Sequence, residues 1–348
     1  MNIFVTGGCG FIGSNFVLRQ INKQKNVILN YDALTYAGNY DNLESIKNHN
    51  NYNFIEGDIC DSDHLYSSII NFNPDFLINF AAESHVDRSI DSPNSFINTN
   101  IVGTANILQS IVKYNNSKQN NHCKLIHIST DEVFGSLGES GFFKENSRYS
   151  PNSPYSASKA SSDMLVRAWR KTYDLPAIVI NCSNNYGPKQ FPEKLIPLTI
   201  INCINEKPIP LYGDGRNIRD WIYVNDHCDA INLLLTNAKI GHSYNVGGGN
   251  EISNRDVVLN ICQILDELLP MKGGNSYKSL INYVKDRPGH DFRYAIDSSK
   301  IFNELGWKPA VSFKIGLKKT VQWYLENRHW WEKITKSKYS QERLGLID

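Results

Sequence analysis

The chain has 348 residues, of which 36 are basic and 35 acidic, so its net charge is +1. This length suffices for an extensive core and for one domain with an elaborated second lobe. The balanced charge gives no reason to expect nucleic acid or an anionic membrane as a partner, and no apolar run reaches membrane-spanning length.

The seven cysteines are scattered, and no two of them form a C-x-x-C pair. Disulfides and a structural zinc are therefore not expected, and we predict no metal site. The chain starts directly with a strand pattern rather than with a charged and apolar leader. These features indicate a soluble protein of the cytoplasm.

The first predicted strand, residues 2–6, leads into a glycine-rich turn and then into a helical pattern to about Gln20. Gly7, Gly10 and Gly13 have the spacing G-x-x-G-x-x-G. Glycines at such a turn let the backbone approach a pyrophosphate, to which the helix N-terminus supplies N–H donors. The pattern predicts a dinucleotide site, and an ordinary strand-to-helix turn is the alternative.

A second strand, residues 27–31, ends in Asp32. This is about the position at which an acidic side chain meets the adenosine ribose hydroxyls of a dinucleotide. A carboxylate there would repel a 2′-phosphate, so NAD is favoured over NADP as the cofactor. The alternative, Asp32 as a simple turn residue, leaves the glycine spacing unexplained.

Strand and helix patterns continue to alternate along the first half of the chain, over residues 53–56, 62–72, 76–80, 94–114 and 124–129. Alternation with apolar strands predicts an α/β, Rossmann-like fold with a doubly wound parallel sheet. We assign residues 1–188 to an NAD-binding domain that also carries the catalytic residues. Residues 189–348 would form mainly a smaller α/β substrate lobe, with some segments returning to the first domain.

Polar segments follow two strands of the predicted sheet, at the carboxyl ends where ligands bind in such folds. Ser84 lies in the first segment, where a helix N-cap is an equal alternative. Asp131 and Glu132 lie in the second, beside Thr130. Two carboxyls can divide acid and base roles if their surroundings separate their pKa values, and a solvated turn is the alternative.

Tyr155 and Lys159 stand one turn apart in a helical pattern over residues 155–173. Both side chains therefore leave the same face of the helix. An ammonium near a phenol favours the phenolate and lowers its pKa, so the pair can move a hydroxyl proton during the oxidation of an alcohol. Alone the pattern is weak, because such spacing arises by chance on exposed helices.

The alternation loosens after a strand at residues 177–182 and an amide-rich loop. Lys194, Arg219 and Arg287 follow in this part of the chain, and cations of this kind bind a pyrophosphate. Each alone is more often a surface charge or an ion-pair partner. Together they indicate a diphosphate substrate.

With these motifs, the chain resembles the extended short-chain dehydrogenase/reductase superfamily and, within it, the nucleotide-sugar 4,6-dehydratases of the dTDP-glucose 4,6-dehydratase type. The resemblance covers nearly the whole chain. Its most specific motif is the Thr130-Asp131-Glu132 triplet. Related epimerases and decarboxylases share the glycine turn and Tyr-x-x-x-Lys but typically lack both carboxyls.

The resemblance implies two sets of binding residues and a dimer. Besides the glycines, NAD contacts would come from Phe11, Ile12, Asp32, Asp58, Ile59, Ala81, Tyr155, Lys159 and Asn184. Substrate contacts would come from Ser84, His85, Thr130, Asn185, Lys194, Leu195, Pro210, Tyr212, Arg219, Asn254, Arg287 and His290. Homodimers of the family pair the helices near residues 94–114 and 155–173. Phe134 and Lys189 depart from the family pattern and put local packing or nucleotide preference in doubt.

The implied reaction is the NAD-dependent dehydration of dTDP-glucose or UDP-glucose to the 4-keto-6-deoxy sugar, an early step towards deoxysugars such as rhamnose. Tyr155 would take the C4 hydroxyl proton, with Lys159 binding the nicotinamide ribose, while the C4 hydride moves to NAD. Thr130 would assist by hydrogen bonding while Glu132 removes the C5 proton and Asp131 protonates the leaving C6 hydroxyl. The hydride then returns to C6.

Two other functions stay open at this stage. A nucleotide-sugar 4-epimerase would use only Tyr155, Lys159 and NAD. A non-catalytic NAD-binding regulatory protein would need none of the acid and base groups. The sequence does not distinguish thymine from uracil, because one methyl group changes binding by only about 1 to 3 kcal/mol.

Overall fold

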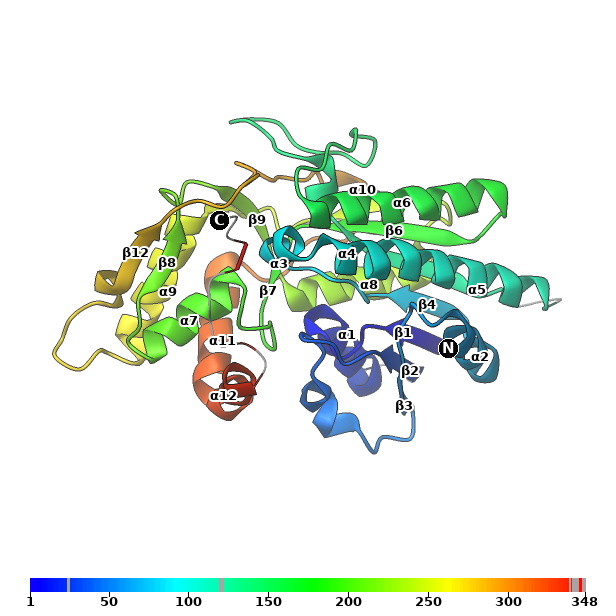
Figure 1. Cartoon of the computed structure of the whole chain (residues 1–348), viewed down its shortest axis with the longest axis horizontal. Coiled ribbons are helices and arrows are strands. Elements are labelled where there is room, and N and C mark those ends of the chain that lie inside the picture. Colours follow the sequence, from blue (N-terminus) through cyan, green and yellow to red (C-terminus); the bar gives the residue numbers. More distant parts are fainter. Residues whose placement is uncertain (24–25, 119–121, 338, 340–343, 346–348) are drawn as a thin grey trace.

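A seven-stranded parallel sheet forms the centre of the larger lobe of the computed structural model, which describes residues 1–23, 26–118, 122–337, 339 and 344–345 (Figure 1). The strands are β1 (Asn2–Thr6), β2 (Val27–Asp32), β3 (Tyr52–Glu56), β4 (Phe76–Asn79), β5 (Lys124–Thr130), β6 (Ala177–Cys182) and β10 (Ser243–Val246). Their order is β10-β6-β5-β4-β1-β2-β3, and every neighbouring pair is parallel. The strand order reverses between β1 and β4, as in a doubly wound fold, which confirms the predicted fold class.

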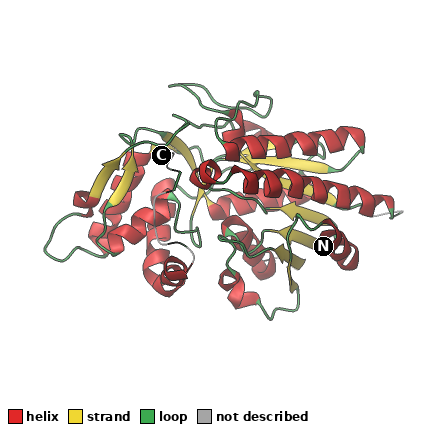
Figure 2. Cartoon of the chain, in the orientation of Figure 1, coloured by secondary structure: helices red, strands yellow, loops and turns green. Residues whose placement is uncertain are grey.

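Helices cover both faces of this sheet because its strands are apolar on both sides (Figure 2). Ile3 and Val5 of β1 belong to one core, and Phe4 between them belongs to the other. The first core packs against α1 (Phe11–Lys23) and α8 (Val224–Asn237). The second packs against α2 (Ser62–Phe72), α5 (Thr104–Asn116) and α6 (Pro154–Thr172).

A smaller lobe has a core of its own and lies on the left in Figure 1. Its strands are β7 (Asn184–Tyr186), β8 (Ile209–Tyr212), β9 (Ile218–Tyr223), β11 (Glu251–Ser253) and β12 (Ile281–Val284). They form a three-stranded sheet, β11-β9-β7, and a parallel pair, β12-β8. Its helices are α7 (Leu195–Ile204), α9 (Asn254–Leu268), α11 (Phe313–Glu326) and α12 (Arg328–Ser337).

Segments after residue 188 return to the larger lobe, namely α8, β10 and α10 (Ser299–Leu305), which packs on β10. The division of labour between residues 1–188 and 189–348 stays a prediction. Short elements complete the chain: η1 (Tyr40–Ile46), α3 (Val86–Asp91), η3 (Asp131–Phe134) and η4 (Tyr277–Leu280). Among the helices of the described ranges, none has both the length and the hydropathy that a membrane span requires.

The helix predicted over residues 94–114 is divided in the structure. It consists of α4 (Pro93–Phe96), the π-helical segment η2 (Ile97–Gly103) and α5. Periodicity reasoning assumes 3.6 residues per turn throughout, so it does not detect a wider turn. Gly103 lies where the chain packs tightly, since a Cβ there would be 2.5 Å from the side chain of Ile59. Wide π turns are frequent at functional sites, and η2 borders one of the cavities described below.

Candidate functional site

Two cavities adjoin at the carboxyl ends of the large sheet, with volumes of about 290 Å³ and 190 Å³. The larger lies along the glycine turn, and the smaller extends towards the small lobe. They share a wall formed by Glu132, Asn184, Asn185, Gln190, Glu193 and Lys194. A molecule in one cavity can therefore touch a molecule in the other, as a hydride transfer between cofactor and substrate requires.

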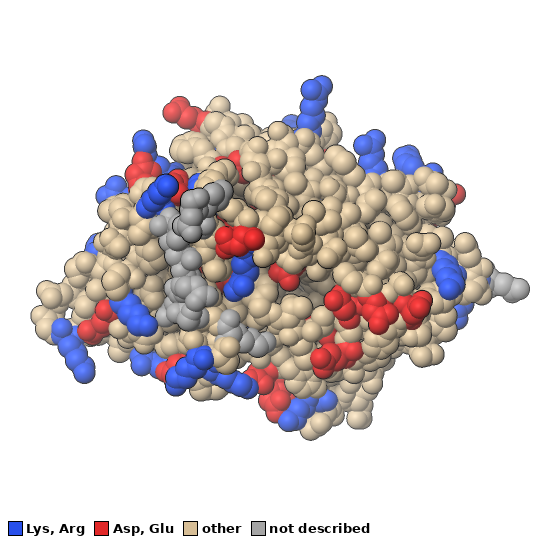
Figure 3. All heavy atoms as spheres, in the orientation of Figure 1, with Lys and Arg blue, Asp and Glu red and all other residues tan. Residues whose placement is uncertain are grey.

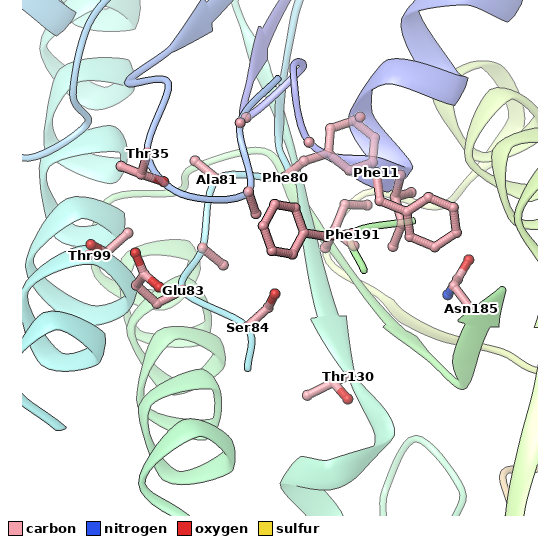
Figure 4. Close-up of a pocket in the computed structure, with 18 of the residues that line it drawn as sticks. Phe11, Thr35, Phe80, Ala81, Glu83, Ser84, Thr99, Thr130, Asn185 and Phe191 are labelled. Carbon is pink, nitrogen blue, oxygen red and sulfur yellow. The ribbon is translucent and has the colours of Figure 1, made fainter. Parts of the chain in front are cut away.

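The structure places the predicted site residues around these two cavities, with one exception. The larger cavity is lined by Gly7, Gly10, Phe11, Ile12, Gly13, Asp32, Asp58, Ile59, Ala81, Ser84, Thr130, Glu132, Tyr155, Lys159 and Asn184. The smaller is lined by His85, Asn185, Lys194, Leu195, Pro210, Tyr212, Arg219, Asn254, Arg287 and His290. Asp131 lines neither cavity. Figure 4 shows Phe11, Ala81, Ser84, Thr130 and Asn185 facing a common space.

Backbone crowding explains the glycines at the turn after β1. Gly7 has φ +72°, and a Cβ there would lie 2.5 Å from the backbone nitrogen of Ala81. A Cβ on Gly13 would lie 2.3 Å from the Gly7 carbonyl oxygen. The turn therefore keeps its shape and leaves the N-terminus of α1 open to the cavity, which fits the pyrophosphate of a dinucleotide.

Asp32 is 7% exposed at the end of β2, and backbone groups fix its carboxylate. One oxygen accepts the N–H of Cys9 at 2.8 Å, and the other accepts the N–H of Leu34 at 2.8 Å. Asp32 also lines the larger cavity, where an acidic side chain can meet ribose hydroxyls. The position fits the predicted preference for NAD.

The loop after β4 is held by the π-helical segment. Asn100 of η2 accepts the backbone N–H of Glu83 at 2.9 Å and donates to the Glu83 carbonyl at 3.0 Å. Its amide also donates to the Ser158 hydroxyl at 2.8 Å, which connects the loop to α6. The N-cap of α3 is His85 rather than Ser84, so the capping alternative for Ser84 was wrong.

Helix α6 begins where a capping box places Tyr155 in its first turn. Ser153 accepts the backbone N–H of Ser156, and Ser156 accepts that of Ser153, with Pro154 at the first helical position. Tyr155 is 8% exposed, and Lys159 follows one turn later at 4%. The cap thus delivers both side chains to the cavity.

The pKa of Tyr155 departs from expectation. Burial raises it well above its ordinary value and the nearby Glu132 raises it further, while a hydrogen bond with Thr130 opposes the shift. The predicted lowering by Lys159 is not the dominant effect, because burial has the largest influence on the Tyr155 pKa. The Lys159 ammonium donates to the Ile128 carbonyl at 2.8 Å. The spacing of Tyr155 and Lys159 predicts that both side chains share one face of the helix. It does not predict the burial of Tyr155, which affects the pKa of the phenol more than the ammonium does.

The two adjacent carboxyls have unlike surroundings. Asp131 is 1% exposed, which excludes the solvated-turn alternative, and burial and Glu132 hold its pKa well above the ordinary value. One Asp131 oxygen accepts the Thr130 hydroxyl at 3.3 Å, and the other has no hydrogen-bond partner among the described residues. Burial raises the pKa of Glu132 as well, but Arg287, Arg219 and Lys194 oppose that rise.

The three predicted cations converge around Glu132 from distant parts of the chain. Lys194 donates to the Ser84 carbonyl at 2.7 Å. Arg287 pairs with Asp87 at 3.0 Å. Arg219 lies over the Tyr294 ring at 4.3 Å and donates to the Asp291 carbonyl at 2.9 Å. The small cavity is therefore lined by these three cations and by three carboxylates, Asp87, Glu132 and Glu193, of which Asp87 is paired with Arg287.

A second buried ion pair near the site was not predicted. Glu193 binds Arg88 at 2.8 Å, and the Arg88 guanidinium lies 4.2 Å over the Tyr36 ring. The partners are 105 positions apart, so no sequence spacing could have paired them. Gln190, which lines both cavities, also lacked a sequence signal.

The two departures from the family pattern lie outside both cavities. Phe134 packs against Phe143 and Tyr149, with ring centroids 5.2 Å and 5.3 Å away. Lys189 donates to the Asn42 carbonyl at 2.5 Å, and burial lowers its pKa to about 8. Both are local packing features. Within the described residues, His, Cys, Asp and Glu form no group that could hold a metal ion.

Comparison with known proteins identifies relatives over the full chain. The family model described as GDP-mannose 4,6 dehydratase matches residues 4–320. The dTDP-glucose 4,6-dehydratase of Escherichia coli is 51% identical, with all of both chains covered. The crystal structure of the Bacillus anthracis dTDP-glucose 4,6-dehydratase, in complex with NAD, has TM-score 0.86 and 48% identity and covers 96% of this chain and 99% of its own. That of the Streptomyces venezuelae enzyme, also with NAD bound, has TM-score 0.88 and 44% identity over 96% and 100%.

Proposed function

The chain belongs to the GDP-mannose 4,6 dehydratase family, and from that membership we infer that it is an NAD-dependent lyase that dehydrates dTDP-glucose. Relatives at 50% identity and above act on dTDP-glucose, which favours thymine where the sequence left the nucleobase open. The observation that carries the dehydratase over the epimerase is the pair of adjacent carboxyls, of which Glu132 lines both cavities and Asp131 is buried next to it.

NAD, when bound, supplies the acceptor that takes the hydride from C4 and returns it to C6, and its charged nicotinamide adds to Lys159 in favouring the phenolate. Tyr155 removes the C4 hydroxyl proton. The neighbouring Thr130 hydroxyl lowers the Tyr155 pKa, so Thr130 favours the phenolate that accepts this proton. Lys159, on the same face of α6, is buried beside Tyr155.

Glu132 and Asp131 then act as base and acid. Three cations oppose the rise in the Glu132 pKa, so Glu132 is the better carboxylate to remove the C5 proton. Asp131 has a pKa well above its ordinary value, so it keeps a proton to give to the leaving C6 hydroxyl. Environments that separate two pKa values assign the two roles.

Arg219, Arg287 and Lys194 hold the diphosphate of the substrate, because they line the cavity that adjoins the cofactor site. Pro210, Tyr212 and other small-lobe residues form the rest of that cavity and would bind the nucleoside. The product, a 4-keto-6-deoxy sugar nucleotide, would supply enzymes that complete deoxysugars such as rhamnose.

A homodimer is part of this proposal. Ile97, Val102 and Met164 are 47%, 46% and 58% exposed on η2 and α6, which pack side by side. Figure 3 shows few charged side chains over this face, where α4, α5 and α6 lie in Figure 1. An uncharged apolar surface of this kind is typical of a subunit interface.

Incubation with dTDP-glucose, followed by mass spectrometry, tests the function. Loss of one water from the substrate is the expected result. A product of equal mass would replace the proposal with 4-epimerisation, and NAD binding without any turnover would favour a regulatory protein. A competition between dTDP-glucose and UDP-glucose in one reaction measures the nucleobase preference.

A further inference from the structure

A row of buried polar side chains runs beneath the catalytic helix. On the sheet face that α6 covers, the strands β1, β4, β5 and β6 first contribute apolar residues. These are Phe4, Leu77, Leu125 and Val179. Two residues further on, the same face carries Thr6, Asn79, His127 and Asn181. All four are at most 1% exposed. Buried polar groups require partners, so the row must be connected.

Hydrogen bonds join Thr6, Asn79 and His127 in this row and define which ring nitrogen of His127 carries the proton. Thr6 donates to the Asn79 oxygen at 2.7 Å, so the Asn79 amide nitrogen faces His127 Nδ1, 3.2 Å away. An amide nitrogen only donates, so Nδ1 accepts and the ring proton lies on Nε2. Burial and Lys159 hold the His127 pKa well below its ordinary value, which keeps the ring neutral.

Asp163 lies next to the end of this row, where His127 Nε2 and Asp163 Oδ1 face each other and neither has a hydrogen-bond partner among the described residues. Asp163 follows Lys159 by one turn on α6, and its Oδ1 lies 3.5 Å from His127 Nε2. Its Oδ2 accepts Ser129 at 2.8 Å, Tyr149 at 2.9 Å and Asn181 at 3.2 Å. Asp163 is 3% exposed, so the fold fixes a carboxylate where no solvent reaches it.

The carboxylate and the catalytic ammonium influence each other electrostatically without a direct ion pair between them. Tyr155, Lys159 and Asp163 recur at four-residue intervals and share one face of α6. Burial lowers the Lys159 pKa, and Asp163 is the first group that opposes this effect, followed by Cys182. The Lys159 ammonium, in turn, is the leading influence that lowers the pKa of Asp163 against its burial.

We propose that Asp163 is a positioning residue of the reaction: it is the fixed counter-charge that keeps Lys159 protonated beneath Tyr155, and hydrogen bonds from Tyr149, Ser129 and Asn181 keep it ionised. This rests on the proposed function, because it concerns the lysine of the oxidation step. Asp163 touches neither cofactor nor substrate cavity and acts through Lys159 alone.

The pH dependence of the C4 oxidation follows with a defined sign. Burial raises the Asp163 pKa to about 6, so the counter-charge is present above that pH and lost below it. Acid itself keeps an amine protonated, so the counter-charge matters on the alkaline side of the profile, where it delays the loss of the Lys159 proton. C4 oxidation therefore declines at the pH at which Lys159 is deprotonated.

Two variants separate this role from a structural one. Asp163→Asn removes the counter-charge, so the alkaline limb for C4 oxidation should move to lower pH by about one unit, the low end of the effect of a close opposite charge. Tyr149→Phe removes one donor to the carboxylate, which raises the Asp163 pKa but leaves the counter-charge in place at alkaline pH, so the alkaline limb should not move. The measurement is single-turnover NADH absorbance against pH with dTDP-glucose.

A second readout does not depend on turnover. In NAD-loaded protein labelled with ¹³C at aspartate carboxyls, the signal missing from Asp163→Asn should titrate near pH 6 in the original protein and higher in Tyr149→Phe. Asp266→Asn is the control, because Asp266 is also hydrogen-bonded, to Ser276 and Tyr277, but lies in the small lobe on α9.

An Asp163→Asn variant with an unmoved alkaline limb and a rate lowered equally at every pH would show that Asp163 only holds α6 on the sheet, and would overturn the proposal. An Asp163 signal that titrates at the same pH in Tyr149→Phe would do the same. Failure of the original protein to form NADH or a dehydrated product would instead contradict the proposed function, while the carboxyl titration still decides this proposal.

Discussion

At the residue scale, the reaction depends on two neighbours in sequence that the fold keeps in unlike electrostatic surroundings. Asp131 starts the short η3 helix and turns into the protein, whereas Glu132 reaches both cavities and meets three cations. Adjacent carboxyls would otherwise titrate alike. The sequence identifies Asp131 and Glu132 only as a candidate acid–base pair. Their different surroundings in the structure favour Asp131 as the acid and Glu132 as the base.

Asp131→Asn removes the acid but keeps the shape of the side chain. We expect NAD binding and C4 oxidation to persist, while water loss slows by about 10²- to 10⁴-fold, the usual contribution of a general acid. Stopped-flow NADH absorbance would show an intermediate that accumulates rather than decays. Dehydration at the original rate would remove Asp131 from the mechanism. This test is needed because Asp131 lies outside both cavities.

Tyr155→Phe should abolish the first step itself. Without the phenol, no group on α6 takes the C4 proton, so we expect NADH formation to fall by about 10²- to 10⁴-fold. Ser161→Ala, on the partly exposed side of the same helix, is the control for folding. Hydride transfer at an unchanged rate would show that another residue is the base.

At the element scale, the glycine turn and the strand ends were predictable, and the π-helical segment and the buried polar row were not. Residues 2–6, 62–72 and 177–182 coincide with β1, α2 and β6 because their apolar periodicity and their turn residues agree. The two hydrogen bonds between the Asn100 side chain and the Glu83 backbone were not predictable, because they need a local change of helical period and a contact between separate segments. The same holds for Asp163, whose partners come from β5, β6 and the preceding loop.

Gly13→Ala tests the turn. A Cβ at this position would lie 2.3 Å from the Gly7 carbonyl oxygen and 2.9 Å from the Gly8 Cα, so backbone must move. We expect a loss of about 1 to 3 kcal/mol in the free energy of unfolding, as for other overpacked positions, together with weaker NAD retention. Chemical denaturation and the NAD content after gel filtration measure the two effects.

Gly138→Ala is the matched control, because nothing lies within 4 Å of the Cβ it would add. It should keep both the stability and the bound NAD of the original protein. If Gly13→Ala behaved like this control, the close approach of α1 to the turn would have no energetic role.

At the scale of the whole molecule, the site exists only because the two lobes meet. Glu132 and Tyr155 come from the large sheet and α6, whereas Arg219 and Lys194 come from the small lobe. Arg287 of the small lobe is tied to Asp87 at the start of α3, and Tyr212 donates to the same carboxylate at 3.2 Å. The lobes are therefore joined by buried polar contacts at the mouth of the substrate cavity, which no reading of either half alone could predict.

The proposed dimer is tested at the same scale. A charge placed in an apolar interface loses its hydration, so Val102→Glu should weaken the association of two copies by at least about tenfold, or about 1.4 kcal/mol. The Ile315→Glu variant adds the same charge at an apolar position that is 55% exposed on α11 of the small lobe, outside this face, and serves as control. Sedimentation velocity over a range of concentrations measures both.

Loss of the dimer should lower NAD retention as well, because Val102 lies on η2. This segment also carries Thr99, which lines the cofactor cavity, and Asn100, which is hydrogen-bonded to the Glu83 backbone. Unchanged association in Val102→Glu would place any interface on another face of the molecule.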